Sequence, residues 1–251
     1  METHPPHRGF RIVDWQAFFR LHHDLPREGP GAPEDVDWVL RETGLTGAVS
    51  VCDAGCGPGG DLETLAVRLP EANLIGLDKH DGFVTSAQNR CTRFGDRVQV
   101  RQGDMSDPGG PYDLIWCAGA LYFLGVTEGL TSWRKTLAPG GFVAFSEPVK
   151  LQNEMPQAAR EFWQDYPEIT DLAGIEARVD AAGFDILGHR LIVGQAWENY
   201  YAPLRRRIAE LRAVTPDPAM VEMLDMNARE IALWEAASDH IAYALMLVRP
   251  R

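Results

Sequence analysis

Short apolar runs alternate with helical patterns through the middle of the chain. Leu62–Leu69 and Asp81–Arg93 carry apolar residues at helical spacing, and Asp81 is expected to be the N-cap of its helix. A third helix, Glu128–Leu137, is predicted to end before the Pro139-Gly140-Gly141 stop signal. Strands that alternate with helices of this length favour βαβ units and a parallel sheet. The strands are predicted at Ala48–Asp53, Asn73–Leu77, Val98–Arg101, Tyr112–Cys117 and Phe142–Ser146.

Further helices lie on both sides of this alternating block. Before it, Ile12–His22 and Glu34–Thr43 are predicted helices that flank a proline- and glycine-rich loop at residues 25–31. After it, the pattern predicts a strand at Phe184–Val193 and a last strand at His240–Val248. Two long helical patterns separate these late strands and therefore form an insertion. The later helices are predicted at Pro156–Gln164, Leu172–Ala182, Trp197–Ala213 and Pro218–Ala237.

Composition narrows the class of protein. The 251 residues, 45% of them hydrophobic, suit one domain with its own core. The formal net charge of −12 argues against binding to a nucleic-acid backbone. No apolar run reaches 18 residues and no signal-peptide pattern is present, so no membrane span is expected. The four cysteines form no C-x-x-C motif, which favours reduced thiols, a cytoplasmic location and no metal site.

A glycine-rich turn, residues 51–60 (VCDAGCGPGG), follows the first predicted strand. Glycine tolerates positive φ and lets a ligand approach the backbone, and the amides that begin the next helix face that ligand. Gly55, Gly57 and Gly60 match the dinucleotide pattern G-x-G-x-x-G. Asp78 follows the second strand and is expected to accept both ribose hydroxyls. Nicotinamide-dependent oxidoreduction and methyl transfer from S-adenosylmethionine both suit this arrangement.

Features outside the turn separate these two reactions. Asp53 precedes the glycines in the order D-x-G-x-G-x-G, and Gly103-Asp104-Met105 follows the third strand, where an acid can accept from an adenine amino group. Residues 137–141 (LAPGG) precede the fifth strand. The Tyr-x-x-x-Lys pair of many short dehydrogenases is absent, because no tyrosine lies four positions before a lysine. These features favour methyl transfer.

The order VCDAGCGPGG, GLD, GDM, YDLIWCAGALYFL and LAPGGFVAFSEP resembles class I S-adenosylmethionine-dependent methyltransferases over residues 47–148. LPREGPG, EGLTSWRKTLAPGG, EFWQDYPEI and W-x-x-Y-Y-x-P resemble a bacterial subgroup of small-molecule methyltransferases with an N-terminal R-[QE]-G-P-G loop. The resemblance implies a doubly wound, Rossmann-like α/β fold whose seven-stranded sheet ends in an antiparallel strand. It names a reaction and leaves the acceptor open.

The same resemblance implies a set of cofactor contacts. The glycines of the turn line the methionine part of S-adenosylmethionine, and Asp53 supports its ammonium group. Asp78 holds the ribose, whereas Asp104 and the Met105 amide hold the adenine. Residues just past the fourth strand border the methyl group. The implied cofactor-binding residues are Arg27, Asp53, Ala54, Gly55, Gly57, Gly59, Asp78, Lys79, Asp104, Met105, Cys117 and Ala118.

The N-terminal loop is one candidate source of acceptor contacts. It carries His22, His23, Arg27 and Glu28, and its prolines and glycines suit a lid that closes over the cofactor, although an ordinary connection between helices has the same composition. Arg27 would then bind a carboxylate of the cofactor or the substrate. His23 is a candidate for proton transfer, with the alternative that it is an ordinary structural histidine.

Two other segments supply candidates. Glu147, directly after the fifth strand, suits a base or an ammonium partner, or is a solvated loop carboxylate. Tyr122 is a second candidate for proton transfer, which the reaction needs only if the acceptor has a proton to lose. Several aromatic residues suit either a cage around a cationic acceptor or ordinary helix packing. They are Trp163, Tyr166, Trp197, Tyr200 and Tyr201.

The sequence thus predicts a methyltransferase acting on a small molecule. Residues 1–46 are expected to form N-terminal helices and a lid loop, and residues 47–251 a methyltransferase domain with a helical cap at about 195–238. The chain lacks the Asn/Asp-Pro-Pro-Tyr/Phe motif of DNA and amide-nitrogen methyltransferases after its fourth strand, which favours a small acceptor. A nicotinamide oxidoreductase and a non-catalytic cofactor-binding protein are the alternatives. Both a monomer and a homodimer are compatible with the sequence.

Overall fold

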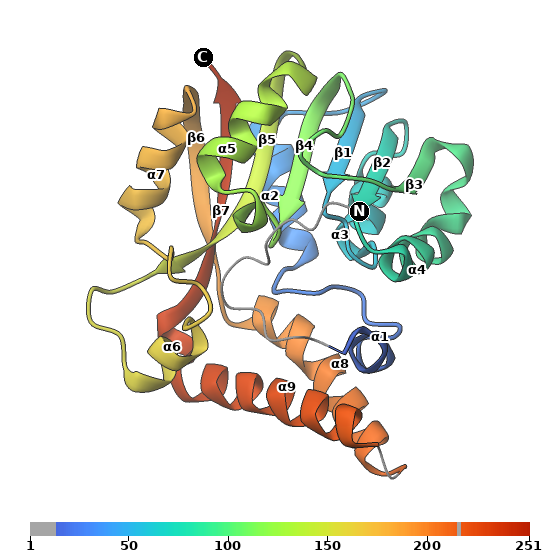
Figure 1. The fold of residues 1–251 in the computed structure, drawn as a ribbon. Helices are drawn as coiled ribbons and strands as arrows, with labels where there is room; N and C mark the ends of the chain where they lie inside the picture. The colour runs from blue at the N-terminus through green and yellow to red at the C-terminus, as the bar shows by residue number, and fades with distance from the viewer. Residues whose placement is uncertain (1–13, 215–216) are drawn as a thin grey trace, which may run out of the picture.

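A seven-stranded sheet organises the chain (Figure 1). The computed structural model describes residues 14–214 and 217–251. The strand order is β3-β2-β1-β4-β5-β7-β6, and β7 runs antiparallel to both of its neighbours. The Rossmann-like sheet with an antiparallel last strand is therefore confirmed. The strands are β1 Ser50–Ala54, β2 Asn73–Asp78, β3 Val98–Gln102, β4 Tyr112–Ala118, β5 Leu137–Lys150, β6 Phe184–Ile192 and β7 Ile241–Pro250.

Helices cover both faces of this sheet because alternate strand residues point to opposite sides. In β1, Val51 packs in the apolar cluster that includes α2 and α3, whereas Cys52 packs in the cluster that includes α5 and α7. The α-helices are α1 Trp15–Leu21, α2 Pro33–Thr43, α3 Gly60–Arg68, α4 Asp81–Cys91, α5 Val126–Trp133, α6 Gln157–Phe162, α7 Leu172–Ala181, α8 Gln195–Arg212 and α9 Pro218–Ala237. The 3-10 helices are η1 Thr92–Arg97, η2 Leu121–Phe123, η3 Arg134–Thr136 and η4 Ser238–His240.

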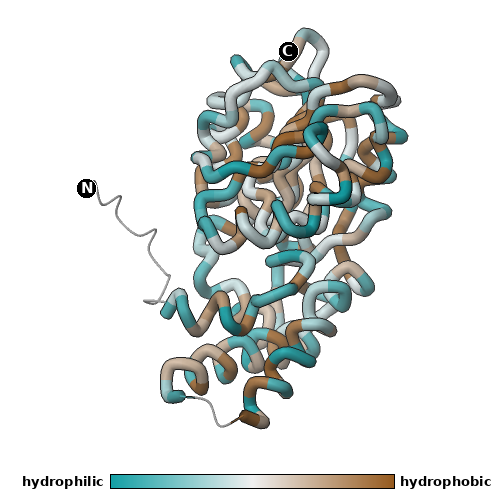
Figure 2. Tube along the Cα trace, turned by 90° about the vertical axis from the view of Figure 1, so that its right-hand side faces the viewer, coloured by the Kyte–Doolittle hydropathy of each residue, from teal (hydrophilic) through white to brown (hydrophobic). Residues whose placement is uncertain are grey.

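A separate helical layer lies beyond the carboxyl ends of the parallel strands. It contains α1, α8 and α9, and Figure 2 shows it below the body of the sheet. The α8–α9 pair is the insertion predicted between the last two strands. Stacking of Trp197 on Trp234, with ring centroids 6.2 Å apart, joins α8 to α9. An ion pair of 3.0 Å between Arg20 and Asp217 joins α1 to the start of α9.

Several predicted element boundaries are wrong by a few residues. Asp81 is not the N-cap of α4: His80 holds that position, and the Asp81 carboxylate accepts the amide of Gly82 at 2.8 Å. The third predicted helix begins at Val126 and ends at Trp133, because the next three residues tighten into η3. The fifth strand starts at Leu137 and not at residue 142, since residue 137 already pairs with β4. The part of the first predicted helix before residue 14 lies outside the described residues.

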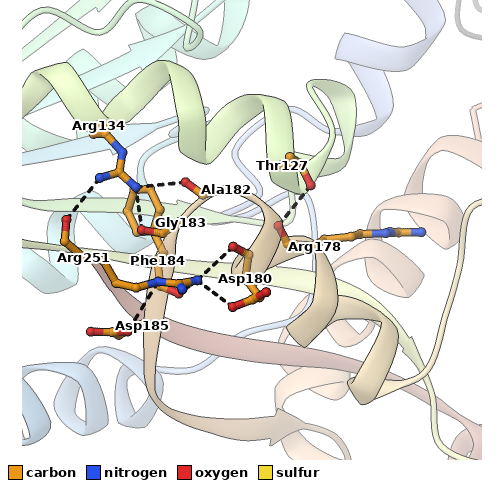
Figure 3. Close-up of polar contacts among 9 residues, drawn as sticks. All are labelled: Thr127, Arg134, Arg178, Asp180, Ala182, Gly183, Phe184, Asp185 and Arg251. Carbon is orange, nitrogen blue, oxygen red and sulfur yellow. Dashed lines mark hydrogen bonds and ion pairs between the residues drawn. The ribbon is translucent and has the colours of Figure 1, made fainter.

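The end of the chain fixes α7 against the sheet (Figure 3). Arg251 donates to the Asp180 carboxylate at 2.6 Å, and Arg134 donates to the carbonyl of Ala182 at 3.0 Å. On the other side of α7, the Thr127 hydroxyl donates to the carbonyl of Arg178 at 3.0 Å. The Arg178 side chain points away from this cluster. Contacts with both neighbouring segments therefore set the position from which Arg178 reaches the site described below.

Candidate functional site

The glycine-rich turn brings the ends of three strands together. The amides of Gly55 and Cys56 both donate to the carbonyl of Leu77, at 2.9 and 2.8 Å, so the turn is tied to β2. Gly55 has a φ of +80°, and a Cβ there would lie 2.7 Å from the Cβ of Ala120 and 3.6 Å from the Sδ of Met105. The chain therefore needs glycine at this position, where the residues that follow β1, β3 and β4 converge.

Asp78 ends β2 and holds the turn through two backbone hydrogen bonds. Its Oδ2 accepts the amide of Gly57 at 2.9 Å, and its Oδ1 accepts the amide of His80 at 2.9 Å. A carboxylate oxygen has two lone pairs, so each oxygen can accept a further donor. Asp78 therefore presents a positioned, partly exposed carboxylate at the edge where parallel sheets bind ligands.

Asp53, in β1 before the glycine turn, is a buried carboxyl group with one oxygen that has no partner. It is 2% exposed, and its Oδ2 has no hydrogen-bond partner. Burial raises the pKa of Asp53 well above its usual range, and the nearby charges of Asp61 and Asp78 raise it further. A buried, unpaired carboxyl among other acids is costly, and a cation beside it would remove most of that cost.

Arg27 lies in this cluster and is already paired. Its guanidinium donates to Asp61 Oδ1 at 2.7 Å, and the indole of Trp116 donates to Asp61 Oδ2 at 3.2 Å. The N-terminal loop also packs closely on α3: a Cβ at Gly60 would lie 2.2 Å from the carbonyl oxygen of Pro26. The structure thus places the loop over the turn, with Arg27 bound to a protein carboxylate.

The same loop contains a buried His22–Glu28 pair. His22 is 5% exposed and its Nδ1 lies 2.5 Å from a Glu28 carboxylate oxygen. Burial raises the pKa of Glu28, whose Cγ would lie 3.8 Å from a Cβ at Gly57. The sequence offered one signal for His22: it follows Phe18 by four residues, and the two rings stack on the inner face of α1.

His23, chosen from the sequence for proton transfer, lies elsewhere. Its side chain is 68% exposed and pairs with Asp24 at 2.9 Å. It borders a surface hollow lined also by Gln16, Phe19, Arg20, Arg207 and Leu211. His22 is the C-cap of α1 and stacks on Phe18, whereas His23 lies in the turn that follows and is exposed to solvent.

The remaining candidates for cofactor contacts lie at or just after the carboxyl ends of β1 to β4, with Cys117 and Ala118 inside β4 and not past it. Ala54 is fully buried and Lys79 is exposed, with its carbonyl accepting the Gln102 amide group at 2.9 Å. Asp104 Oδ1 accepts the amide of Ser106 at 2.8 Å. The remaining members are Met105, whose carbonyl accepts the Trp133 indole at 2.6 Å, the buried Cys117, and Ala118, which pairs with Ser146 of β5.

A cluster of four tyrosines lies between the sheet and the helical layer. They are Tyr122 in η2, Tyr166 before α7, Tyr200 in α8 and Tyr243 in β7. The rings of Tyr122 and Tyr166 are 5.1 Å apart. Burial is the main cause that raises the pKa of each of the four, whereas hydrogen bonds with Tyr122 and Tyr243 lower that of Tyr166. The tyrosine cluster is therefore a group of neutral hydroxyls that lie close to one another.

Glu147 lies on β5 opposite Ala244 of β7, so its side chain is on the other face of the sheet from Tyr243. It is 6% exposed, its Oε1 lies 3.8 Å from Arg178, and its Oε2 has no hydrogen-bond partner. Burial raises the pKa of Glu147 to about 7, although Arg178 lowers it. Its charge raises the pKa of Cys117, at the end of β4, and of Tyr243. Glu147 is thus a buried carboxyl inside β5, which runs on to Lys150, and not a residue that follows the strand or a solvated loop carboxylate.

The other predicted aromatic candidates belong to the core. The Trp197 indole donates to the carbonyl of Ile192 at 3.1 Å, and its ring packs against Trp163 and Tyr243. Tyr201 is fully buried and donates to Glu230 at 2.9 Å. These side chains therefore pack against members of the tyrosine cluster: Trp197 contacts Tyr243, and Tyr201 contacts Tyr200.

Within residues 14–214 and 217–251, no group of three or more His, Cys, Asp or Glu side chains is placed to hold a metal ion. The helices within these ranges are also too short or too polar to cross a membrane.

Comparisons with known proteins agree on one family. Residues 51–141 match the model described as a methyltransferase domain. Trans-aconitate 2-methyltransferase of Yersinia pestis is 30% identical over 203 residues, which cover 77% of this chain and 75% of that protein. The enzyme of the same name from Methylobacterium nodulans is 30% identical over 169 residues, and the match spans 62% of its length.

Solved structures share the fold. A SAM-dependent methyltransferase from Geobacter sulfurreducens, in complex with S-adenosyl-L-homocysteine, has a TM-score of 0.83 at 21% identity and covers 96% of this chain and 100% of its own. A SAM-dependent methyltransferase from Thiobacillus denitrificans, also with S-adenosyl-L-homocysteine, has a TM-score of 0.83 at 20% identity with the same coverage.

Proposed function

Because this chain belongs to the class I S-adenosylmethionine-dependent methyltransferases, we propose that it transfers a methyl group from S-adenosylmethionine to a small-molecule acceptor. The bound cofactor supplies a methyl group on a sulfonium, which is an excellent leaving group. The protein then has to align the nucleophile, the methyl carbon and the sulfur, and alignment is the largest contribution it can make to such a displacement.

The observation that carries the proposal is the unpartnered, buried Oδ2 of Asp53 beside the glycine turn. An ammonium group is the complement of this carboxyl, and the methionine part of the cofactor carries one. Asp78, with one backbone donor on each oxygen, suits two ribose hydroxyls. Asp104 and the Met105 amide would then hold the adenine, and Cys117 and Ala118 would border the methyl group.

Arg27 takes a different role in this proposal from the one expected from the sequence. Since its guanidinium is bound to Asp61, we assign it to holding the N-terminal loop over the cofactor. The division into an N-terminal segment 1–46 and a methyltransferase domain 47–251 with a cap at about 195–238 belongs to the same proposal, as does membership of the R-[QE]-G-P-G subgroup. So do a cytoplasmic location and the absence of a nucleic-acid partner.

Calorimetric titration with S-adenosylhomocysteine tests the proposal, with NAD in a parallel titration. We expect micromolar binding of S-adenosylhomocysteine and none of NAD. The Asp53→Asn protein should bind more weakly, because the ammonium group loses its counter-charge. Tight NAD binding would instead assign the glycine turn to a nicotinamide cofactor. Binding of neither ligand would refute a cofactor site at this turn.

A further inference from the structure

We propose that Glu28, on the N-terminal loop, is the counter-charge of the sulfonium of S-adenosylmethionine, so that the protein binds this cation more tightly than the uncharged product, S-adenosylhomocysteine. This inference rests on the proposed function and deepens it, because it names the residue that distinguishes cofactor from product. The two ligands share the ammonium, ribose and adenine groups that are assigned to Asp53, Asp78 and Asp104. Those contacts therefore cannot make the distinction.

The covalent structure of the cofactor places its sulfur between two groups of the site. The sulfur joins the ribose to the methionine chain that ends in the ammonium group. In the proposed function Asp78 holds the ribose and Asp53 faces the ammonium, so the sulfur lies over the part of the glycine turn between them. Gly57 belongs to that part: it follows Asp53 by four residues, and its amide donates to Asp78 Oδ2 at 2.9 Å.

Glu28 packs on this part of the turn. Its Cγ lies 3.8 Å from the position that a Cβ of Gly57 would take, so the side chain reaches the turn from the N-terminal loop. Its Oε2 lies 2.5 Å from His22 Nδ1, whereas its Oε1 is buried without a hydrogen-bond partner. A sulfonium has no N–H or O–H group and acts on a carboxylate through its charge alone. It therefore suits an oxygen to which the protein offers no donor.

The charges around Glu28 leave room for a cation from a ligand. Arg27, the next residue in the chain towards the N-terminus, is bound to Asp61 at 2.7 Å. Burial is the main cause that raises the pKa of Glu28, and the charge of Asp78 raises it further, whereas His22 lowers it. A positive charge beside the carboxylate favours its ionised form, and this attraction is stronger in a buried site than in water.

Contacts on both sides of Glu28 fix the N-terminal loop. Before it, the Arg90 guanidinium donates to the carbonyl of Leu25 at 3.3 Å and to that of Pro58 at 2.9 Å, which ties the loop to the glycine turn. After it, the amide of Gly31 donates at 3.1 Å to a carbonyl in the first turn of α8. The carboxylate is therefore held in position over the turn before a ligand binds.

The reaction removes the charge that Glu28 recognises. A lone pair of the acceptor forms the new bond to the methyl carbon while the methyl–sulfur bond breaks, and the electron pair of the broken bond stays on sulfur. The sulfur is then a neutral thioether, and the attraction between it and the Glu28 carboxylate is lost. The site therefore favours the entry of S-adenosylmethionine and the release of S-adenosylhomocysteine.

Calorimetric titration of the full-length protein with three ligands tests the inference. They are S-adenosylmethionine, S-adenosylhomocysteine and sinefungin, which carries an amine in place of the methyl group and is a cation at that position. The wild type should bind both cations at least tenfold more tightly than S-adenosylhomocysteine. Equal affinities, or tighter binding of S-adenosylhomocysteine, would overturn the inference and leave the cofactor site intact. Binding of none of the three would instead refute the proposed function.

Three variants assign the preference to Glu28. Glu28→Gln should lower the affinity for both cations at least tenfold, while the affinity for S-adenosylhomocysteine stays within twofold and shows that the variant is folded. Glu28→Asp keeps the charge and should keep a preference of at least threefold. Glu34→Gln, which alters an exposed carboxylate in α2, is the control and should match wild type. An unchanged preference in Glu28→Gln, or an equal loss of affinity for all three ligands, would show that Glu28 does not recognise the sulfonium.

Discussion

The two ends of the site are built in different ways. At the cofactor end, short contiguous motifs contribute backbone amides and acids, and Asp78 and the glycine turn hold each other through hydrogen bonds. At the other end, the candidate residues come one at a time from η2, β5, the segment before α7, α8 and β7, and Glu147 lies on the opposite face of the sheet from Tyr243. The first end is therefore suited to one invariant ligand. At the second end, a single substitution can alter one side chain without disturbing the others.

This difference has an energetic side. Burial is the main cause that raises the pKa of both Asp53 and Glu147, but the charges of Asp61 and Asp78 raise that of Asp53 further, whereas Arg178 lowers that of Glu147. A bound cation should lower the electrostatic cost of the buried carboxyl at the cofactor end. At the second end the buried carboxyl is instead poised to gain and lose a proton near neutral pH.

The largest expected effect is the pH dependence that Glu147 gives to the unfolding free energy, and it tests the difference between the two ends. The pKa of Glu147 rises from 4.5 unfolded to about 7 folded, so its contribution to stability is present below pH 4.5 and is lost as pH rises through 7. The loss should amount to about 3 kcal/mol of unfolding free energy. Glu147→Gln should remove this part of the pH dependence in urea denaturation at pH 5 to 8. An identical pH dependence in wild type and variant would show that Glu147 is not buried as a carboxyl. Glu168→Gln should match wild type, because that carboxylate lies near the same arginine but is 91% exposed.

A second substitution addresses the cofactor end alone. Asp78→Ala removes the acceptor of two backbone amides and, in our proposal, of two ribose hydroxyls. The affinity for S-adenosylhomocysteine should fall by about 1.5–3 kcal/mol, as calorimetry would measure. Asp81→Ala, three residues further on and exposed, should stay within twofold of wild type. Unchanged affinity in Asp78→Ala would make the ribose assignment wrong.

The smallest expected effect concerns the support of the acceptor end. Tyr201→Phe removes the hydroxyl that donates to Glu230 at 2.9 Å, and the unfolding free energy should fall by about 1 kcal/mol. The affinity for S-adenosylhomocysteine should not change. A double-mutant cycle with Glu230→Gln isolates the contact, because the two single effects should not add. Additive effects would show that the hydrogen bond contributes nothing to stability.

The sequence predicted most of the fold because the fold depends on local patterns. Apolar runs, helical spacing and the stop at residues 139–141 located the strands and helices, and the α8–α9 insertion was recognised from two long helical patterns between late strands. The boundary errors arose where an adjacent strand or an adjacent residue, and not the local pattern, set the start of the element. β5 begins early because Leu137 finds a partner on β4, and Asp81 does not cap α4 because His80 precedes it in extended conformation.

The sequence by itself determined the reaction family and the placement of the acids near the carboxyl ends of β1, β2 and β3, since each lies inside a motif at the end of its own strand. Tertiary structure alone decided what those groups face. It buried His22 and exposed His23, paired Arg27 with Asp61, and left one oxygen of Asp53 and one of Glu147 without a partner. The physical reason is that burial and electrostatic environment depend on segments far apart in the chain, which no local pattern encodes.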